Sequence, residues 1–212
     1  MSNLQILGAP QSPLVWAVRM TAAEKGIDVD LLPMRPHTPE IQAIQPFGKI
    51  PAMRHGDIEL SESCAIARYI DGLDSRVKLM PAALVDAARV EQWIMHFHTE
   101  YLPLMLGRYI VQYFFPANGV PDRKAIEATL APMEKATAIL ERQLDGRDYL
   151  LGDFSQADIF FAPLLHYLSA LPEGGRIVAA APRVAAYVAR LSARAAFKAT
   201  FPPPLPGREA AA

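Results

Sequence analysis

The 212-residue sequence has little cysteine, little net charge and no long hydrophobic run. Its one cysteine, Cys64, excludes an intrachain disulfide framework and favours a reducing compartment. The formal net charge of −1 gives no excess of positive charge for nucleic acid or an anionic membrane. No apolar run approaches the roughly 18–20 residues of a membrane span, and the start lacks the basic and apolar segments of a secretory signal. We therefore expect a cytoplasmic protein with no nucleic-acid or membrane partner.

The first eighty residues have the pattern of a packed α/β domain. Half of the chain is hydrophobic (51%) and a fifth is charged (20%), which is typical of a globular protein. Strand and helix patterns alternate here, and glycine and proline mark their limits. The expected elements are a strand at 4–7, a helix from Ser12 to Gly26, a strand at 27–33, a hairpin at 50–60 and a helix at 61–73. The order βαβ followed by ββα predicts a right-handed crossover joined to a hairpin.

The remaining sequence predicts helices only. No strand pattern appears from residue 81 onward, and Pro103 is expected to kink the first long helix. The expected helices lie at 86–115, 123–144, 156–171 and 182–194.

Four residues predict where one of these helices begins. Ser155 and Asp158 have the spacing of a capping box, although Glu or Gln is more usual at the second position. Phe154 and Ile159 stand at the flanking staple positions. We interpret this motif as structural, because it would start a helix inside the helical half.

The two patterns together predict two domains. We expect an α/β domain at 1–75, a linker at 76–85 and an all-helical domain at 86–201. The proline-rich tail at 202–212 is expected to be extended or disordered.

Three stretches make the chain resemble a cytosolic glutathione S-transferase. They are "QPFGKIPAM" at 45–53, "LSESCAIARYI" at 60–70 and "SQAD" at 155–158. The turn "APQSP" at 9–13 looks most like the serine-type branch, the phi and theta kinds. The resemblance runs from about residue 4 to 201 and implies a thioredoxin-like N-terminal domain followed by an all-α C-terminal domain. It also implies glutathione as co-substrate, with no metal.

The Ile50-Pro51 step is the first candidate binding element. Proline lacks a backbone N–H and fits a sheet only at an edge, a strand start or a bulge. The residues alone leave open whether Pro51 starts an ordinary strand in trans or follows a cis bond. A cis bond would turn the Ile50 backbone outward, where an extended peptide could pair with it. The resemblance implies the cis form and a contact with glutathione.

Glu62 and Ser63 are candidates for binding the γ-glutamyl group. The N-terminus of a helix presents free N–H groups and a positive dipole end, which suit a carboxylate. The resemblance implies that Ser63 holds this carboxylate and that Glu62 pairs with the adjacent ammonium. Alternatively, Ser63 is only a cap and Glu62 only complements the dipole.

Lys49 and His37 are candidates for holding the glycyl carboxylate. Lys49 matches a position that often lies beside glutathione in the family. His37 lies in the loop where phi-type relatives carry basic residues at two adjacent positions. In this chain one of those two positions is occupied by Pro36, which is not basic. The alternative for both side chains is a solvated surface charge.

Ser12 is the candidate catalytic residue. A free thiol with a pKa near 8.5 is mostly protonated at neutral pH, whereas the thiolate is the nucleophile. The resemblance implies that the Ser12 hydroxyl donates to the glutathione sulfur and favours the thiolate. Gln11 is a nearby second donor. The alternative is that Ser12 is a plain helix cap before Pro13.

Two other kinds of site, a reactive cysteine and a histidine metal site, have weaker support in the sequence. Cys64 could suggest a thiol-exchanging relative, but the helix pattern predicts a buried apolar position for it. His96 and His98 are two apart on a helix and point in different directions, which argues against a metal site.

An acceptor pocket is expected from Trp16, Met95, His98, Thr99, Leu102 and Tyr109, although such a helical stripe is more often core.

The resemblance implies transfer of the glutathione thiolate to small hydrophobic electrophiles. Two alternatives stay open, namely a peroxidase or dehalogenase on the same site and a non-catalytic binding or stress-response protein. An aromatic residue at the position of Phe47 inserts into the partner subunit in several family branches. We therefore expect a homodimer with Phe47 at its interface.

Overall fold

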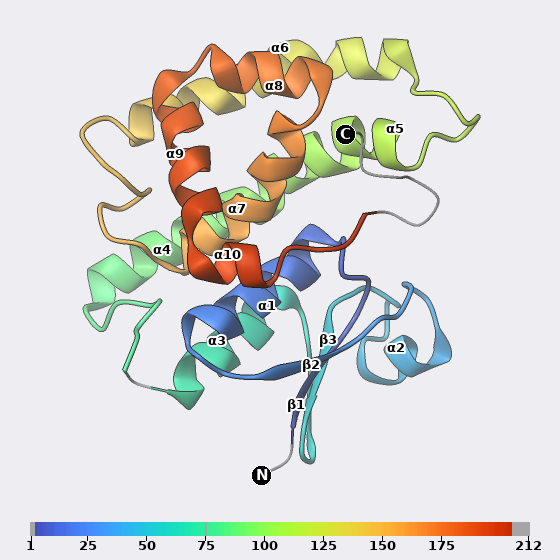
Figure 1. The fold of residues 1–212 in the computed structure, drawn as a ribbon, viewed down its shortest axis with the longest axis vertical. Helices are drawn as coiled ribbons and strands as arrows, with labels where there is room; N and C mark the ends of the chain where they lie inside the picture. The colour runs from blue at the N-terminus through green and yellow to red at the C-terminus, as the bar shows by residue number, and fades with distance from the viewer. Residues whose placement is uncertain (1–2, 75, 205–212) are drawn as a thin grey trace. The chain divides into compact units, whose positions relative to one another are not determined.

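The computed structural model describes residues 3–74 and 76–204, and the chain divides into two compact units (Figure 1). The first unit contains the residues up to Leu79 together with the segment from Arg194 onward, and the second contains Met80–Ala193. Of the predicted tail, residues 202–204 have no regular secondary structure. Residues 205–212 lie outside the described part.

The first unit is built on a four-stranded mixed sheet. Its strands are β1 (Leu4–Leu7), β2 (Val29–Leu32), β3 (Ala52–His55) and β4 (Ile58–Ser61), in the order β2-β1-β3-β4. β1 pairs in parallel with β2 and antiparallel with β3, and β3 pairs antiparallel with β4. The predicted βαβ order with parallel strands and the predicted hairpin are confirmed, and Gly56 and Asp57 form the hairpin turn.

Helices α1 (Pro13–Glu24), α2 (Pro39–Ile44) and α3 (Ser63–Leu73) complete this part of the unit. Two apolar clusters show how alternating strand residues serve opposite faces of the sheet. Ile6 joins the cluster that contains Val15 of α1 and Ile66 of α3. Leu7 joins the cluster that contains Ile41 of α2.

Local sequence explains where α1 and α2 begin. Ser12 and Thr38 each stand at an N-cap and accept a hydrogen bond from a backbone N–H, of Val15 and Ile41 respectively. In both helices a proline follows the cap, where its missing N–H is harmless and its fixed φ suits the first turn. The predicted Ser-Pro start at residue 12 is confirmed.

The second unit is helical, as predicted. Its helices are α4 (Leu84–His96), the π-helical η1 (Phe97–Ile110), α5 (Val111–Phe114), α6 (Arg123–Gln143), α7 (Gln156–Ser169), α8 (Pro172–Ala179) and α9 (Pro182–Ala193). The helix predicted at 86–115 is therefore continuous but changes its winding around Pro103, a residue that cannot donate an intrahelical hydrogen bond. None of the described helices is long and apolar enough to span a membrane.

The predicted capping box organises α7, most of whose side chains are buried. The Asp158 carboxylate accepts hydrogen bonds from the backbone N–H and the hydroxyl of Ser155, and also from Leu150 N and the Tyr187 hydroxyl. Burial raises the pKa of Asp158 and these hydrogen bonds oppose the rise. One carboxylate thus caps α7 and links it to α9 and to the loop before α7.

The predicted boundary of the helical domain at residue 201 is corrected by the structure. Arg194 forms two hydrogen bonds with Glu24 at the end of α1, at 2.6 and 2.8 Å. Thr200 accepts a 3.0 Å hydrogen bond from the Trp16 indole, whose ring also contacts Phe197. The short helix α10 (Ala195–Ala199) and the residues around it therefore pack along α1 (Figure 1). Sequence reasoning also missed α8, which contains two glycines.

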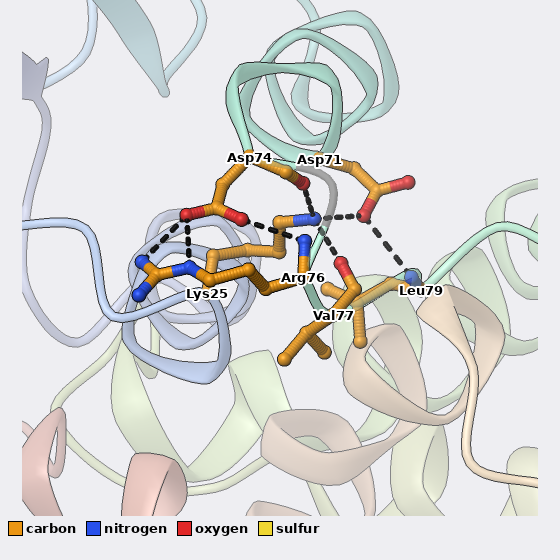
Figure 2. Close-up of polar contacts among 6 residues, drawn as sticks. All are labelled: Lys25, Asp71, Asp74, Arg76, Val77 and Leu79. Atoms are coloured by element: carbon orange, nitrogen blue, oxygen red, sulfur yellow. Dashed lines mark hydrogen bonds and ion pairs between the residues drawn. The ribbon is translucent and has the colours of Figure 1, made fainter.

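The start of the predicted linker is bound to the first unit by a buried lysine. Lys25, at the end of α1, has a fully buried side chain that pairs with Asp71 of α3 at 3.0 Å. Its ammonium also donates to the carbonyls of Asp74 and Val77, and Asp71 accepts from the backbone N–H of Leu79 (Figure 2). The predicted linker at 76–85 is thus fixed as far as Leu79, and α4 begins at Leu84.

Candidate active site

Ser12 stands at the turn between β1 and α1 with its side chain half-buried. Its hydroxyl oxygen accepts from Val15 N at 3.5 Å, which is a long cap bond. A hydroxyl has one donor proton and two acceptor lone pairs, so this bond leaves the proton available. Ser12 can therefore cap α1 and donate to a ligand atom at the same time.

The Ile50-Pro51 peptide is cis, as the sequence resemblance implied. Across residues 3–74 and 76–204, the backbone N–H and carbonyl of Ile50 have no hydrogen-bond partner. Strand β3 begins two residues later, at Ala52, where pairing with Leu7 starts. An unpaired backbone segment beside a sheet can pair with an extended peptide.

One apolar cluster brings the Ser12 turn, Ile50 and the start of α3 together. Val15, one turn after Ser12, and Ile66, near the start of α3, are buried in this cluster, and Ile50 packs against it. Gly8 makes the close approach possible. A Cβ there would lie 2.6 Å from the Val15 side chain and 3.2 Å from Cβ of Ile50. The three segments predicted to bind one ligand are thus neighbours in the same unit.

Glu62 and Ser63 form the start of α3. Glu62 is the N-cap residue and has a φ of 68°, in the left-handed region that residues other than glycine rarely adopt. Its side chain is exposed and makes no cap hydrogen bond, whereas Ser63 is buried. The helix therefore begins without a side-chain cap, and its first N–H groups are available to an anion.

Gln45 is a residue of this region that sequence reasoning did not single out. It is 1% exposed, and its amide nitrogen donates to Glu62 Oε1 at 3.0 Å. Its amide oxygen accepts from Lys49 N, also at 3.0 Å. The quoted motif at 45–53 contains this glutamine, but spacing alone does not reveal a contact with Glu62.

Lys49 and His37, the two predicted cations, are exposed residues of adjoining segments. His37 N donates to Gly48 O at 2.7 Å, which joins the loop after β2 to the loop before Pro51. Gly48 has a φ of 70°, and a Cβ there would lie 2.3 Å from the His37 ring nitrogen. Glycine is thus required at this position for the two segments to meet.

Gln11 lies against the C-terminal segment. Its amide nitrogen donates to the carbonyls of Pro203 and Pro204, at 3.2 and 3.1 Å. The contact places residues 203–204 beside the residue that precedes Ser12. The predicted role of Gln11 as a second donor to sulfur stays a prediction.

The six residues predicted for the acceptor pocket fall into two groups. Trp16 and Tyr109 are fully buried and donate hydrogen bonds inside their own units, to Thr200 and Glu173 respectively. Met95 and Thr99 are exposed, and His98 and Leu102 are half-buried. The structure thus gives Trp16 and Tyr109 the character of core residues, and the other four keep surface for a ligand.

Cys64 has the properties of an unreactive thiol. Burial raises its pKa to about 11, and the negative charge of Glu62 contributes to the rise. The side chain is half-buried, which is more exposed than the sequence predicted. A thiol with this pKa is almost wholly protonated at neutral pH, so Cys64 is a poor nucleophile.

Metal ligands are not gathered in the described part of the chain. No three His, Cys, Asp or Glu side chains come together there as a metal site would need. His96 and His98 lie at the junction of α4 and η1, and each makes aromatic contacts. Ser12, the Ile50 backbone and the uncapped start of α3 offer hydrogen-bonding groups to a peptide ligand.

Comparisons with known proteins match both units. The family model described as the glutathione S-transferase N-terminal domain matches residues 2–72. The model described as the glutathione S-transferase C-terminal domain matches residues 123–190. Glutathione S-transferase 3 from Zea mays is 36% identical and covers 96% of this chain and 98% of its own.

Two solved structures have the same fold. Glutathione transferase F7 from Populus trichocarpa has a TM-score of 0.85 and 30% identity, covering 93% of this chain and 97% of its own. Glutathione S-transferase I from mais, solved in complex with an atrazine glutathione conjugate, has a TM-score of 0.84 and 27% identity. It covers 94% of this chain and 96% of its own. The similarity therefore extends over nearly the whole chain.

Proposed function

Because the chain belongs to the glutathione S-transferase family, it binds glutathione and conjugates it through its sulfur to electrophiles, and we propose that Ser12 is its catalytic residue. The observation that carries this proposal is the hydroxyl of Ser12. Its proton is available while its oxygen caps α1. Glutathione is the co-substrate, and the expected absence of a metal stays a prediction.

In the proposed reaction, the Ser12 hydroxyl donates a hydrogen bond to the glutathione sulfur. This bond is stronger to the thiolate than to the thiol, so it lowers the pKa of the bound thiol. The thiol releases its proton to solvent. The sulfur electron pair of the thiolate then forms a bond to an electrophilic carbon, and the leaving group departs with its bonding pair. Ser12 forms no covalent bond in this scheme.

The rest of glutathione is proposed to bind along three segments. The Ile50 backbone would pair with the cysteinyl unit, because its N–H and carbonyl are unpaired in the described chain. Ser63 and the first N–H groups of α3 would hold the γ-glutamyl carboxylate, and Glu62 would pair with the ammonium. Lys49 and His37 are proposed to hold the glycyl carboxylate, since both are exposed cations or potential cations on joined loops.

The acceptor is proposed to be a small hydrophobic electrophile. Met95, His98, Thr99 and Leu102 keep exposed or half-exposed surface and are retained as candidates to contact it. We also propose that the protein is a cytoplasmic homodimer with Phe47 at its interface. The side chain of Phe47 is 73% exposed in the single chain and is therefore available to a partner.

An activity panel tests the proposed function. Purified protein is assayed with glutathione and each of three acceptors, a chlorodinitrobenzene-type aryl halide, a hydroperoxide and a disulfide. We expect the highest rate with the aryl halide, and Ser12→Ala should lower it. A faster hydroperoxide reaction would favour the peroxidase alternative. Glutathione binding without turnover of any acceptor would favour the non-catalytic alternative.

A further inference from the structure

Gln45 is a buried polar residue at the end of α2, and both ends of its amide are used. Its nitrogen donates to the Glu62 carboxylate and its oxygen accepts from the Lys49 backbone N–H. A buried amide must find partners because desolvation without hydrogen bonds is costly. Only one orientation of the amide suits these two partners. If the amide were flipped, its oxygen would face the Glu62 carboxylate and its NH₂ group would face the Lys49 N–H, so neither hydrogen bond could form.

The bond to Glu62 restrains a carboxylate that has little other support. Glu62 has a positive φ and an exposed side chain, and it makes no cap hydrogen bond to α3. Within residues 3–74 and 76–204, Gln45 supplies its one side-chain hydrogen bond. This bond uses Oε1 and leaves Oε2 for a ligand ammonium.

The bond to Lys49 restrains the segment that enters the Ile50-Pro51 step. Gly48 N also donates to the backbone carbonyl of Gln45 at 2.9 Å, and Gly48 O accepts from His37 N. The loop is thus closed around Gln45 by its backbone and its side chain together. One residue ties this loop to the start of α3, 17 positions away in the sequence.

We propose that Gln45 is a positioning residue for glutathione, holding the Glu62 carboxylate and the Lys49–Ile50 backbone in the geometry that binds the peptide. The inference rests on the proposed roles of Glu62 and Ile50. Gln45 itself touches no substrate. Its amide holds the loop before Pro51 and the start of α3 in place before glutathione binds. The entropy cost of ordering these two segments on binding is therefore lower, which strengthens the complex.

The effect should appear in glutathione affinity rather than in the chemical step. Neither hydrogen bond of the Gln45 side chain involves Ser12, so the proposed donor to the thiolate is kept when Gln45 is replaced. Gln45→Ala should weaken glutathione binding about tenfold or more, the loss expected of one hydrogen bond to a charged group. The turnover rate at saturating glutathione should stay within about twofold of wild type. The lost interaction stabilises bound glutathione equally before and in the transition state, so its loss leaves the barrier from the bound state unchanged.

Two further variants separate positioning from folding. Gln45→Glu keeps the side-chain size and the acceptor for Lys49 N, but it sets a second carboxylate against Glu62. It should weaken glutathione at least as much as Gln45→Ala. Gln42→Ala is the matched control, because Gln42 is an exposed glutamine on the same helix, and its affinity should equal that of wild type.

A double-mutant cycle with Glu62→Ala tests the path of the effect. Calorimetry gives the glutathione dissociation constant of wild type, both single variants and the double variant, with folding checked by circular dichroism. If Gln45 acts mainly through Glu62, Gln45→Ala should lower the glutathione affinity only about two- to threefold in the Glu62→Ala background. The effects of substituting two interacting residues are not additive. The same cost in both backgrounds would contradict the proposal.

Three other outcomes would overturn either the role of Gln45 or the proposed function. Unchanged affinity in Gln45→Ala and Gln45→Glu, with lower thermal stability, would make Gln45 structural only and overturn the proposal. A fall in turnover at saturating glutathione with unchanged affinity would overturn it too. Wild-type protein that binds no glutathione would instead overturn the proposed function, which the first titration reveals before any variant is compared.

Discussion

The Ser12 hydroxyl is shared between the helix and the ligand that we propose. Its oxygen serves as cap acceptor for Val15 N, and its proton has no acceptor in the described chain. The two roles predict different consequences when the hydroxyl is removed. Loss of a cap lowers stability, whereas loss of a donor to sulfur changes the thiol pKa.

For Ser12→Ala we expect the bound glutathione thiol to have a higher pKa. Removing a donor to a charged group costs roughly 1.5–3 kcal/mol, and one pKa unit is about 1.4 kcal/mol. The thiol pKa should therefore rise by roughly one to two units, and turnover at neutral pH should fall and partly recover at higher pH. Ultraviolet titration of the bound thiolate measures the shift.

The control for this variant is Thr38→Ala. Thr38 caps α2 in the same way, with a proline at the next position. Both variants should lose about 1 kcal/mol of stability as caps, but only Ser12→Ala should move the thiol pKa. If the two behave alike in the titration, Ser12 is only a cap, and another donor such as Gln11 must act on the sulfur.

At the scale of elements, two charged clusters join helices that are distant in the sequence. In the first unit, Lys25 joins α1, α3 and the chain after α3 through Asp71 and two backbone carbonyls (Figure 2). In the second unit, Glu173 of α8 accepts from Tyr109 of η1 and from Arg123 of α6. Each cluster contains a buried charge with several partners, so removal of one member should be costly.

Replacing Lys25 with methionine should destabilise the first unit by about 3–5 kcal/mol, the usual cost of leaving a buried charge unpaired. Asp71 and the carbonyls of Asp74 and Val77 would each lose a donor. Urea unfolding measures the change, with the exposed Lys135→Met as control. A loss below about 1 kcal/mol would mean that solvent reaches the site and replaces the ammonium.

Glu173→Gln should destabilise the helical unit in a pH-dependent way. Burial alone would raise the pKa of Glu173, but hydrogen bonds from Tyr113, Arg123 and Tyr109 outweigh it and lower the pKa to about 2. A carboxyl with a lowered pKa in the folded state stabilises above its unfolded pKa of about 4.3. This contribution is lost as the pH falls from there towards about 2.

We therefore expect Glu173→Gln to cost roughly 1.5–3 kcal/mol at pH near 7, the worth of hydrogen bonds to a charged group. The difference from wild type should be clearly smaller at pH near 3. Urea unfolding of both proteins at the two pH values checks the sign. A difference that grows on acidification would contradict the lowered pKa.

At the scale of the whole molecule, the proposed glutathione site is contained in the first unit. Ser12, Ile50 and Glu62 all belong to it, and so does the C-terminal segment that contacts Gln11. The same unit carries Phe47, an exposed aromatic residue in the loop that Gln45 closes. Assembly and glutathione binding would thus depend on one loop.

Phe47→Ala should weaken the homodimer that we propose. An aromatic side chain buried at the centre of an interface is typically worth 2 kcal/mol or more, so the dimer dissociation constant should rise roughly 30-fold or more. Light scattering and sedimentation across a concentration series measure it. Phe115→Ala is the control, because Phe115 is 69% exposed and lies outside this loop. A wild-type monomer at micromolar concentration would contradict the dimer, and an unchanged dimer would contradict only the role of Phe47.

Features that depend on neighbouring residues could be predicted from the sequence. The caps at Ser12 and Ser155, the hairpin and most helix limits follow from patterns a few residues long, and the structure confirms them. The family and its cis Ile50-Pro51 step could be predicted because the short motif at 45–53 is specific. The roles of the individual site residues stay predictions.

Contacts between residues distant in the sequence could not be predicted and are known from the folded structure. Gln45 reaches Glu62 across 17 positions, Lys25 reaches Asp71 across 46, and Trp16 reaches Thr200 across 184. Periodicity shows which face of an element is apolar but not which other element covers it. The last of these contacts assigned residues 194–201 to the first unit, contrary to the sequence prediction, because burial of the Trp16 ring and its N–H required a partner that local pattern does not name.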